Sequence, residues 1–176
     1  MSDDIKHTNF AVIDWDENGQ PFSDNYGDVY FSRHNGLDET RHVFLQHNHL
    51  EERWNEVEKK QVHSENITEN NSEFVVGETG FGTGLNFLAT WQLWDKVKKE
   101  TCVNDSIATT HSKTLHFISV EKHPLLKNDL QRSLSLWPEL KEYSEKLLSV
   151  YDDYPSSGFK QLTLSDSVKL TLIVND

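Results

Sequence analysis

The chain has 176 residues, of which 35% are hydrophobic, and a formal net charge of −12 at pH 7. This length and hydrophobic content suit one domain with a single core. The excess of acidic residues argues against strong nucleic-acid binding by this chain alone, because phosphate contacts need clustered Lys and Arg.

The sequence carries no targeting or membrane signal that would take it out of the cytoplasm. Its apolar runs are too short to span a bilayer, and its first residues are acidic instead of basic and then apolar. The one cysteine, Cys102, excludes an internal disulfide. We therefore expect a cytoplasmic protein without a membrane partner.

Residues 1–57 are predicted to form a small β-rich extension with a short helix. The segment 10–22 is typical of a hairpin, because Asn18-Gly19 forms a turn that tolerates positive φ. A second extended, aromatic run covers 26–32, and the apolar residues of 37–45 suit a short helix. The next segment, 58–72, is almost wholly polar and is predicted to be a surface loop.

Residues 73–176 alternate between strand and helix patterns. A β-branched and aromatic run at 74–76 ends in a glycine-rich loop, and apolar residues at helical spacing follow from Leu85 to about Lys99. Trp91, Trp94 and Trp137 are predicted to belong to the core. After a polar loop at 100–113, the remaining elements are predicted as a strand at 115–121, a helix starting at Pro124, a helix after Pro138, and strands at 161–164 and 168–176.

This alternation predicts an α/β sheet that is parallel at its centre. The sharpest motif lies between its first strand and helix: Glu78-Thr79-Gly80-Phe81-Gly82-Thr83-Gly84. Glycines at this position let the backbone approach a ligand, and the free N–H groups at the start of a helix favour a negatively charged group. Open α/β sheets bind their ligands at this point.

The spacing of the glycines discriminates between ligands. A dinucleotide fingerprint would need glycine at position 85, which is Leu85, and no Gly-Lys-Ser/Thr of a phosphate-binding P-loop is present. An acidic residue followed by three alternate glycines resembles the loop of class I methyltransferases, which holds the amino-acid end of S-adenosylmethionine. The alternative is a tight strand-to-helix turn without a ligand.

Acidic residues end the two strands that follow the loop. Glu121, at the carboxyl end of the strand 115–121, is placed to accept both ribose hydroxyls of a nucleoside. Asp176 ends the last strand, where related methyltransferases place an acid near the adenine amino group; a solvated terminal acid is the alternative. His42, His47 and His49 with Glu51 and Glu52 match no zinc spacing, so no metal is predicted.

Four stretches together resemble the MnmC family. They are residues 28–45, which include DVYFS, NGLDET and VFL; residues 77–88, GETGFGTGLNFL; residues 115–121; and the Trp-Pro-Glu-Leu sequence at 137–140. The resemblance implies a class I, Rossmann-like methyltransferase fold. It also implies methylation of the aminomethyl group on the wobble (2-thio)uridine of tRNA, with S-adenosylmethionine as cofactor and tRNA as partner of the complete protein.

The resemblance also implies roles for individual residues. Those assigned to the methionine moiety of the cofactor are Glu78, Gly80, Gly82, Thr83 and Gly84. Glu121 would bind the ribose and Asp176 the adenine, and Tyr30 and Asn35 are candidates for the pocket wall.

The sequence departs from the family pattern at its carboxyl end. A fourth strand that ends in Asp-Gly-Phe-x-Pro is absent, and so is the C-terminal FAD-dependent oxidoreductase domain that the family commonly adds. We therefore expect 73–176 to be the first half of the cofactor-binding domain of a truncated protein, with an unpaired edge at the strand 74–76. The catalytic residues would lie in the missing segment, and Asp176 is the one candidate within the chain.

Two other functions stay open at this point. A non-catalytic remnant could bind a nucleoside cofactor or nothing, as the absent fourth strand suggests. A nicotinamide-dependent oxidoreductase is disfavoured by Leu85.

Overall fold

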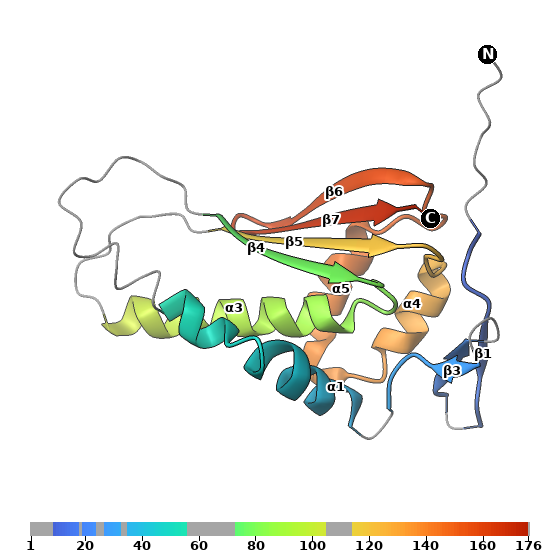
Figure 1. Ribbon diagram of the computed structural model, residues 1–176, viewed down its shortest axis with the longest axis horizontal. Helices are drawn as coiled ribbons and strands as arrows, with labels where there is room; N and C mark the ends of the chain where they lie inside the picture. Colours follow the sequence, from blue (N-terminus) through green and yellow to red (C-terminus); the bar gives the residue numbers. More distant parts are fainter. Residues whose placement is uncertain are drawn as a thin grey trace, which may run out of the picture.

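The computed structural model describes residues 9–17, 19–23, 27–32, 35–55, 73–104 and 114–175, without the side chains of 101–104. These residues form an α/β domain with two sheets, one of three strands and one of four. The fold is the Rossmann-like class predicted from the sequence, with the small β-rich extension at the N-terminal end (Figure 1).

The N-terminal sheet is antiparallel, in the order β1-β2-β3. It consists of β1 (Ile13–Trp15), β2 (Pro21–Ser23) and β3 (Asp28–Val29). The predicted hairpin is confirmed by the pairing of β1 with β2, and Gly19 in its turn has φ +78°. Asn18, the other turn residue of the prediction, lies outside the described residues.

The helix predicted at 37–45 is present in two pieces. An α-helix, α1 (Gly36–Glu39), continues directly into a π-helix, η1 (Thr40–Gln46), and residues 50–55 are again helical. Leu37 and Leu45 are buried, so this segment packs its apolar side onto the domain.

The main sheet has the strand order β4-β5-β7-β6. Its members are β4 (Glu73–Thr79), β5 (Thr114–Glu121), β6 (Gly158–Ser165) and β7 (Val168–Val174). The first two and β7 are parallel, whereas β6 runs antiparallel to β7 as a hairpin. Figure 1 shows the helices on one face of this sheet: α3 (Leu85–Asn104), α4 (Lys127–Leu134), the short 3-10 helix η2 (Pro138–Leu140) and α5 (Lys141–Val150).

Several predicted boundaries were wrong by a few residues. The polar residues 100–104, expected in a loop, continue α3, because polarity alone does not end a helix that lacks Gly or Pro. The helix expected at Pro124 begins at Lys127, since Leu126 is still extended (ψ 147°) and the Pro124 carbonyl accepts the Ala11 N–H. Strand β6 begins three residues before the expected 161.

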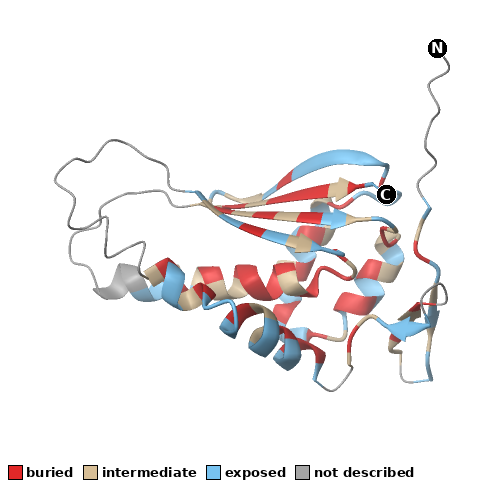
Figure 2. Cartoon of the chain, in the orientation of Figure 1, coloured by how far each residue is buried: buried red, intermediate tan, exposed pale blue. Residues whose placement is uncertain are grey.

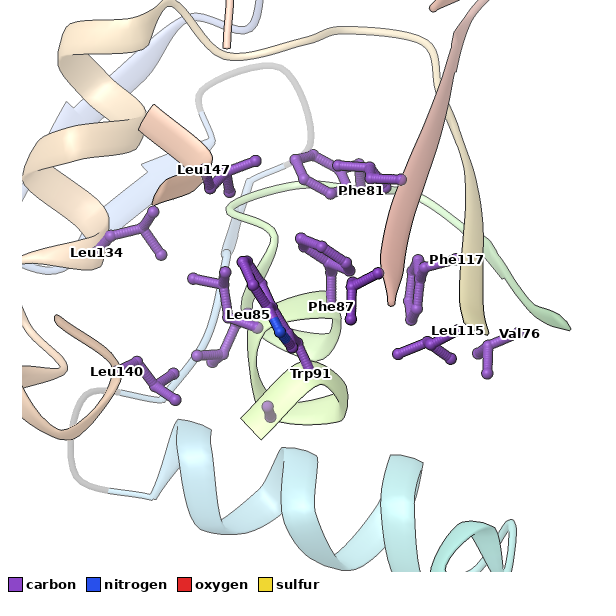
Figure 3. Close-up of a cluster of buried hydrophobic side chains, with 14 of the residues drawn as sticks. Val76, Phe81, Leu85, Phe87, Trp91, Leu115, Phe117, Leu134, Leu140 and Leu147 are labelled. Atoms are coloured by element: carbon purple, nitrogen blue, oxygen red, sulfur yellow. The ribbon is translucent and has the colours of Figure 1, made fainter. Parts of the chain in front are cut away.

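The core lies between the main sheet and its helices. Phe87 and Trp91 of α3 are fully buried between the sheet and the helical leucines Leu134, Leu140 and Leu147 (Figure 3). The Phe87 ring packs edge-on against Phe117 of β5, with 5.3 Å between ring centroids. Figure 2 shows buried positions alternating with less buried ones along β5, as expected for a sheet with one covered face. Trp94 and Trp137 are also buried, so all three tryptophans predicted to be core are confirmed.

Strand β4 forms one edge of the main sheet. Within the described residues it pairs only with β5, which confirms the unpaired edge predicted for 74–76. Val75 on this strand is 51% exposed.

Among the helices in the described part of the chain, none is both long and apolar enough to cross a membrane.

The N-terminal segment is fixed to the domain through a close approach at Gly36. A Cβ atom on Gly36 would lie 3.0 Å from the Cβ of Phe31 and 3.2 Å from the ring of Trp137. Phe31 and Trp137 pack edge-on against each other, with ring centroids 5.2 Å apart. Glycine at this position therefore lets α1 lie directly against both side chains.

We predict that Gly36→Ala lowers the free energy of unfolding by about 1–3 kcal/mol, because the added methyl group overpacks this contact. Urea unfolding followed by tryptophan fluorescence measures the change. Gly77→Ala is the matched control, since a Cβ at Gly77 meets nothing within 4 Å. Equal unfolding midpoints for the two variants would contradict the prediction.

Candidate functional site

The glycine loop connects β4 to α3 with a backbone that side chains would disturb. Gly80, Gly82 and Gly84 all have positive φ, at +83°, +52° and +70°. A Cβ on Gly84 would also lie 2.7 Å from Cζ of Phe81, which is buried beneath the loop. The loop is tied to the next strand, because the Gly80 N–H donates to the Val120 carbonyl at 2.7 Å.

Glu121 faces the loop from the carboxyl end of β5. Its Oε2 accepts the Gly82 N–H at 2.8 Å, and its Oε1 accepts the His123 N–H at 2.8 Å. The carboxylate therefore stands at the point where the first two parallel strands end, directly beside the backbone of the loop. Hydrogen bonds of this charge-assisted kind are among the stronger ones in proteins.

A cavity of about 560 Å³ opens between this edge and the N-terminal sheet. Four of the predicted residues line it: Tyr30, Gly80, Gly82 and Glu121. Its volume lies in the range of small-molecule sites, and its position at the carboxyl ends of the strands is where open α/β sheets bind ligands. The remaining lining residues are Ser23, Asp28, Val29, Thr79, Val120, Lys122, His123 and Asn175.

Tyr30 forms part of the wall opposite the loop. A Cβ on Gly82 would lie 3.6 Å from the Tyr30 ring, so the ring sits over this glycine. The N-terminal chain is held near the cavity by Asn9 and Ala11: the Asn9 carbonyl lies 3.1 Å from Nδ1 of His123, and the Ala11 N–H donates to the Pro124 carbonyl. The β-rich extension thus forms one side of the cavity.

Glu78 lies under the loop and is not part of the cavity lining. Its Oε1 accepts a hydrogen bond from Nδ2 of Asn86 at 2.8 Å, and its Oε2 accepts one from Oγ of Ser119 at 2.8 Å. Burial raises the pKa of Glu78 to about 7, although both hydrogen bonds oppose the shift; the nearby Glu121 adds to it. The Glu78 carboxylate therefore links the end of β4 to α3 and β5 directly before the loop.

The other predicted residues lie apart from the cavity. Thr83 and Gly84 are buried at the start of α3, where they shape the loop. Asn35 is exposed just before α1 and is not among the lining residues, which does not support its expected place in the pocket wall. Asp176 lies outside the described residues.

Sequence reasoning missed Asp28, Lys122, His123 and Asn175. Lys122 and His123 follow Glu121 directly, so the rule that ligands bind at the carboxyl ends of strands could have identified them. Asp28 begins the DVYFS stretch and Asn175 follows the end of β7, but only the tertiary fold places the two residues at one cavity. Among the residues that the structure describes, no three His, Cys, Asp or Glu side chains gather in a way that could hold a metal ion.

The burial of Glu78 predicts a pH dependence of stability. The Glu78 carboxyl has a higher pKa in the folded chain than in the unfolded chain, so its ionisation destabilises the folded state. Its contribution to the free energy of unfolding therefore falls as pH rises from about 4.5 to about 7. The variant Glu78→Gln is neutral at every pH. Over this range we therefore expect its free energy of unfolding to rise by up to about 3 kcal/mol relative to that of the parent chain. Urea unfolding at pH 5 and pH 8 measures the gain.

The control for this prediction is Glu52→Gln, an exposed glutamate on the helical residues 50–55. Its difference from the parent chain should be the same at both pH values. If the difference for Glu78→Gln were also independent of pH, the carboxyl group would not be buried as described.

Comparison with known proteins gives a consistent set of relatives. The chain is 48% identical over 167 residues to the tRNA 5-methylaminomethyl-2-thiouridine biosynthesis bifunctional protein MnmC of Ectopseudomonas mendocina, and 45% identical over 166 residues to that of Methylobacillus flagellatus. Each match covers 94% of this chain and 22% of the relative. The MnmC protein of Pseudomonas aeruginosa PAO1 is 46% identical over 175 residues, covering 98% of this chain and 23% of the relative.

No family model matches the chain. A crystal structure of MNMC2 from Aquifex aeolicus superposes with a TM-score of 0.57 at 16% identity, over 96% of this chain and 43% of that chain, and it supports the fold alone. The chain spans less than a quarter of the length of the curated relatives it matches. Over this stretch, the sequence identity shows that the chain is homologous to part of these MnmC proteins.

Proposed function

We propose that this chain supplies the S-adenosylmethionine-binding part of a tRNA methyltransferase. The reaction would convert the aminomethyl group of wobble (2-thio)uridine to methylaminomethyl. One observation carries the proposal: at the cavity, the glycine loop with its positive φ angles lies against the Glu121 carboxylate, which accepts the Gly82 N–H. Homology to proteins named for tRNA 5-methylaminomethyl-2-thiouridine biosynthesis supports tRNA modification as the setting of this chemistry.

The residues present fit this cofactor at two points. The backbone of Gly80 and Gly82 would hold the charged methionine end, because glycines leave room for close approach of a ligand. Glu121 would accept the ribose hydroxyls with the carboxylate that now accepts two backbone N–H groups. The role of Asp176 at the adenine stays a prediction.

S-adenosylmethionine supplies a methyl group on a positively charged sulfur. The protein then contributes mainly by orientation, since holding two reactants in line removes a large part of the barrier. Tyr30, Asp28 and Val29 would limit the approach to the cavity from the side of the N-terminal sheet. We assign no general base, and the FAD chemistry implied by the resemblance would belong to a domain outside the matched stretch.

The tRNA contacts are proposed to lie mainly outside this chain. Its formal net charge is −12, and binding to phosphates depends on Lys and Arg that displace counterions.

The second function, a non-catalytic module that binds a nucleoside cofactor or nothing, is favoured by the open edge of β4 beside the loop. Titration of the chain with S-adenosylmethionine distinguishes a module that binds the cofactor from one that binds no ligand.

We predict that S-adenosylmethionine binds to the purified chain and that Gly82→Arg abolishes binding, because the side chain would enter the cavity beside Tyr30. Isothermal titration calorimetry measures both. Gly19→Arg is the matched control: Gly19 also has positive φ, and a Cβ there meets nothing within 4 Å. Absence of binding by a folded parent chain would refute the proposed cofactor site in this chain.

A second variant tests the proposed ribose contact. Glu121→Gln keeps the size of the side chain but removes its charge, and charge-assisted hydrogen bonds are worth about 1.5–3 kcal/mol. We therefore expect the dissociation constant for S-adenosylmethionine to rise by about tenfold to a hundredfold. Methionine alone, which has no ribose, should bind equally weakly to the parent chain and to the variant; a selective loss of methionine binding would contradict the assignment.

A further inference from the structure

A chain of hydrogen bonds links the N-terminal helices to the glycine loop. Oγ1 of Thr40, the first residue of η1, donates to Oδ1 of Asn86 at 3.0 Å. Nδ2 of Asn86, in the first turn of α3, donates to Oε1 of Glu78 at 2.8 Å. Oγ of Ser119 on β5 completes the set with its bond to Oε2 of Glu78. Three elements of the fold, β4, α3 and β5, therefore meet at the Glu78 carboxylate, and η1 is connected to it through Asn86.

The direction of these bonds follows from the chemistry of an amide. An asparagine side chain has one acceptor and two donors, and a carboxylate can only accept. The hydroxyl of Thr40 satisfies the amide oxygen and leaves the NH₂ group directed at Glu78. A reversed amide would place its oxygen against the carboxylate, so Glu78 sets the orientation of Asn86. The Thr40 hydroxyl, which can donate or accept, holds Asn86 in that orientation by donating to its amide oxygen.

Thr40 is well placed for this task because its surroundings are fixed. It is 8% exposed, and the helix that leads into it packs through Gly36 against Phe31 and Trp137. At the next residue of η1, Arg41 Nη2 donates to Oε1 of Gln92 at 3.3 Å, a second polar link to α3. The N-terminal helices are thus held against α3 by both packing and hydrogen bonds.

We propose that Thr40 and Asn86 are positioning residues of the loop: they fix the Glu78 carboxylate and thereby place Thr79, Gly80 and Gly82 at the cavity. This inference deepens the proposed function and rests on it, because the loop is taken to bind the cofactor. It gives the N-terminal helices a part in the site although neither Thr40 nor Asn86 lines the cavity.

The physical reason lies in the burial of Glu78. Glu78 is partly buried, and a carboxylate in such surroundings that loses a donor is driven either to take up a proton or to turn toward water. Glu78 is followed directly by Thr79 and Gly80, both of which line the cavity, so a reoriented carboxylate displaces the backbone that the ligand meets. The Glu121 carboxylate, which faces the same region and raises the pKa of Glu78, adds to the effect.

The test uses substitutions that separate the hydroxyl of Thr40 from its size. Thr40→Val removes the donor, Thr40→Ser retains it, and Asn86→Ala removes both the amide donor and its acceptor. Thr90→Val is the matched control, because the fully buried Thr90 hydroxyl donates to the Asn86 backbone carbonyl at 2.6 Å and does not reach Glu78. Each protein is studied as the full chain, with urea unfolding to confirm that it is folded.

The first measurement is the titration of Glu78 by carbon-13 NMR of the labelled carboxyl group, assigned with Glu78→Gln. We expect a higher titration midpoint in Asn86→Ala and Thr40→Val, and the parent value in Thr40→Ser and Thr90→Val. The second measurement is calorimetry with S-adenosylmethionine, for which we expect about tenfold weaker binding in Asn86→Ala, about threefold in Thr40→Val, and less than twofold change in the other two.

The outcomes separate the two claims. An unchanged Glu78 midpoint in both Asn86→Ala and Thr40→Val would overturn the positioning role, as would an equal loss of binding in Thr40→Val and Thr90→Val. If the Glu78 midpoint shifts in Asn86→Ala and Thr40→Val but the parent chain binds no S-adenosylmethionine, the proposed function is overturned and the hydrogen-bond chain to Glu78 is supported. If Asn86→Ala does not fold, the comparison of Thr40→Val with Thr40→Ser still tests the positioning role.

Discussion

The parallel pairing of β4 with β5, in the register that sets Glu78 opposite Ser119, is the constraint on which the candidate site depends. This register brings the Ser119 hydroxyl to the buried carboxylate, and it sets Thr79 opposite Val120, so that both strands end at the same level. The Gly80 N–H can then reach the Val120 carbonyl, and the Gly82 N–H can reach Glu121. A shift by one residue would turn Glu78 to the other face of the sheet and dismantle all four contacts.

The two carboxylates of the site differ because their surroundings differ. Glu121 stands at a strand end in the wall of an open cavity and accepts two backbone N–H groups. Glu78 lies below the loop, where burial raises its pKa to about 7 in spite of its two side-chain donors. One acid is therefore available to a ligand, and the other acts on the shape of the loop. The family resemblance assigned both residues to the cofactor, and in the structure only Glu121 lines the cavity.

Much of this site was predictable because its signals are local. A glycine-rich loop between a buried strand and an amphipathic helix, and an acid at the end of the next strand, are both visible without the fold, and the structure brings Gly82 and Glu121 together as expected. The contact between Thr40 and Asn86 was not predictable, because it joins residues 46 positions apart and depends on how η1 lies against α3. Asp28 and Asn175 were missed although the first lies in a quoted motif and the second follows a strand end, because only the tertiary fold brings the N-terminal sheet to the end of β7. The end of α3 was misplaced since the residues beyond Lys99 are polar yet continue the helix.

The support of the loop is asymmetric, and this gives the N-terminal helices their importance. In the described part of the chain, β4 has a neighbouring strand only on the side of β5, and Val75 at the other edge is half exposed. In a parallel sheet an inner strand is held by ladders on both sides, whereas an edge strand has one. The end of β4 therefore relies more heavily on what lies beneath it, which is α3 with Asn86 and, behind Asn86, Thr40. The conformation of a loop on an edge strand is thus set as much by the packing of the N-terminal extension as by the sheet itself.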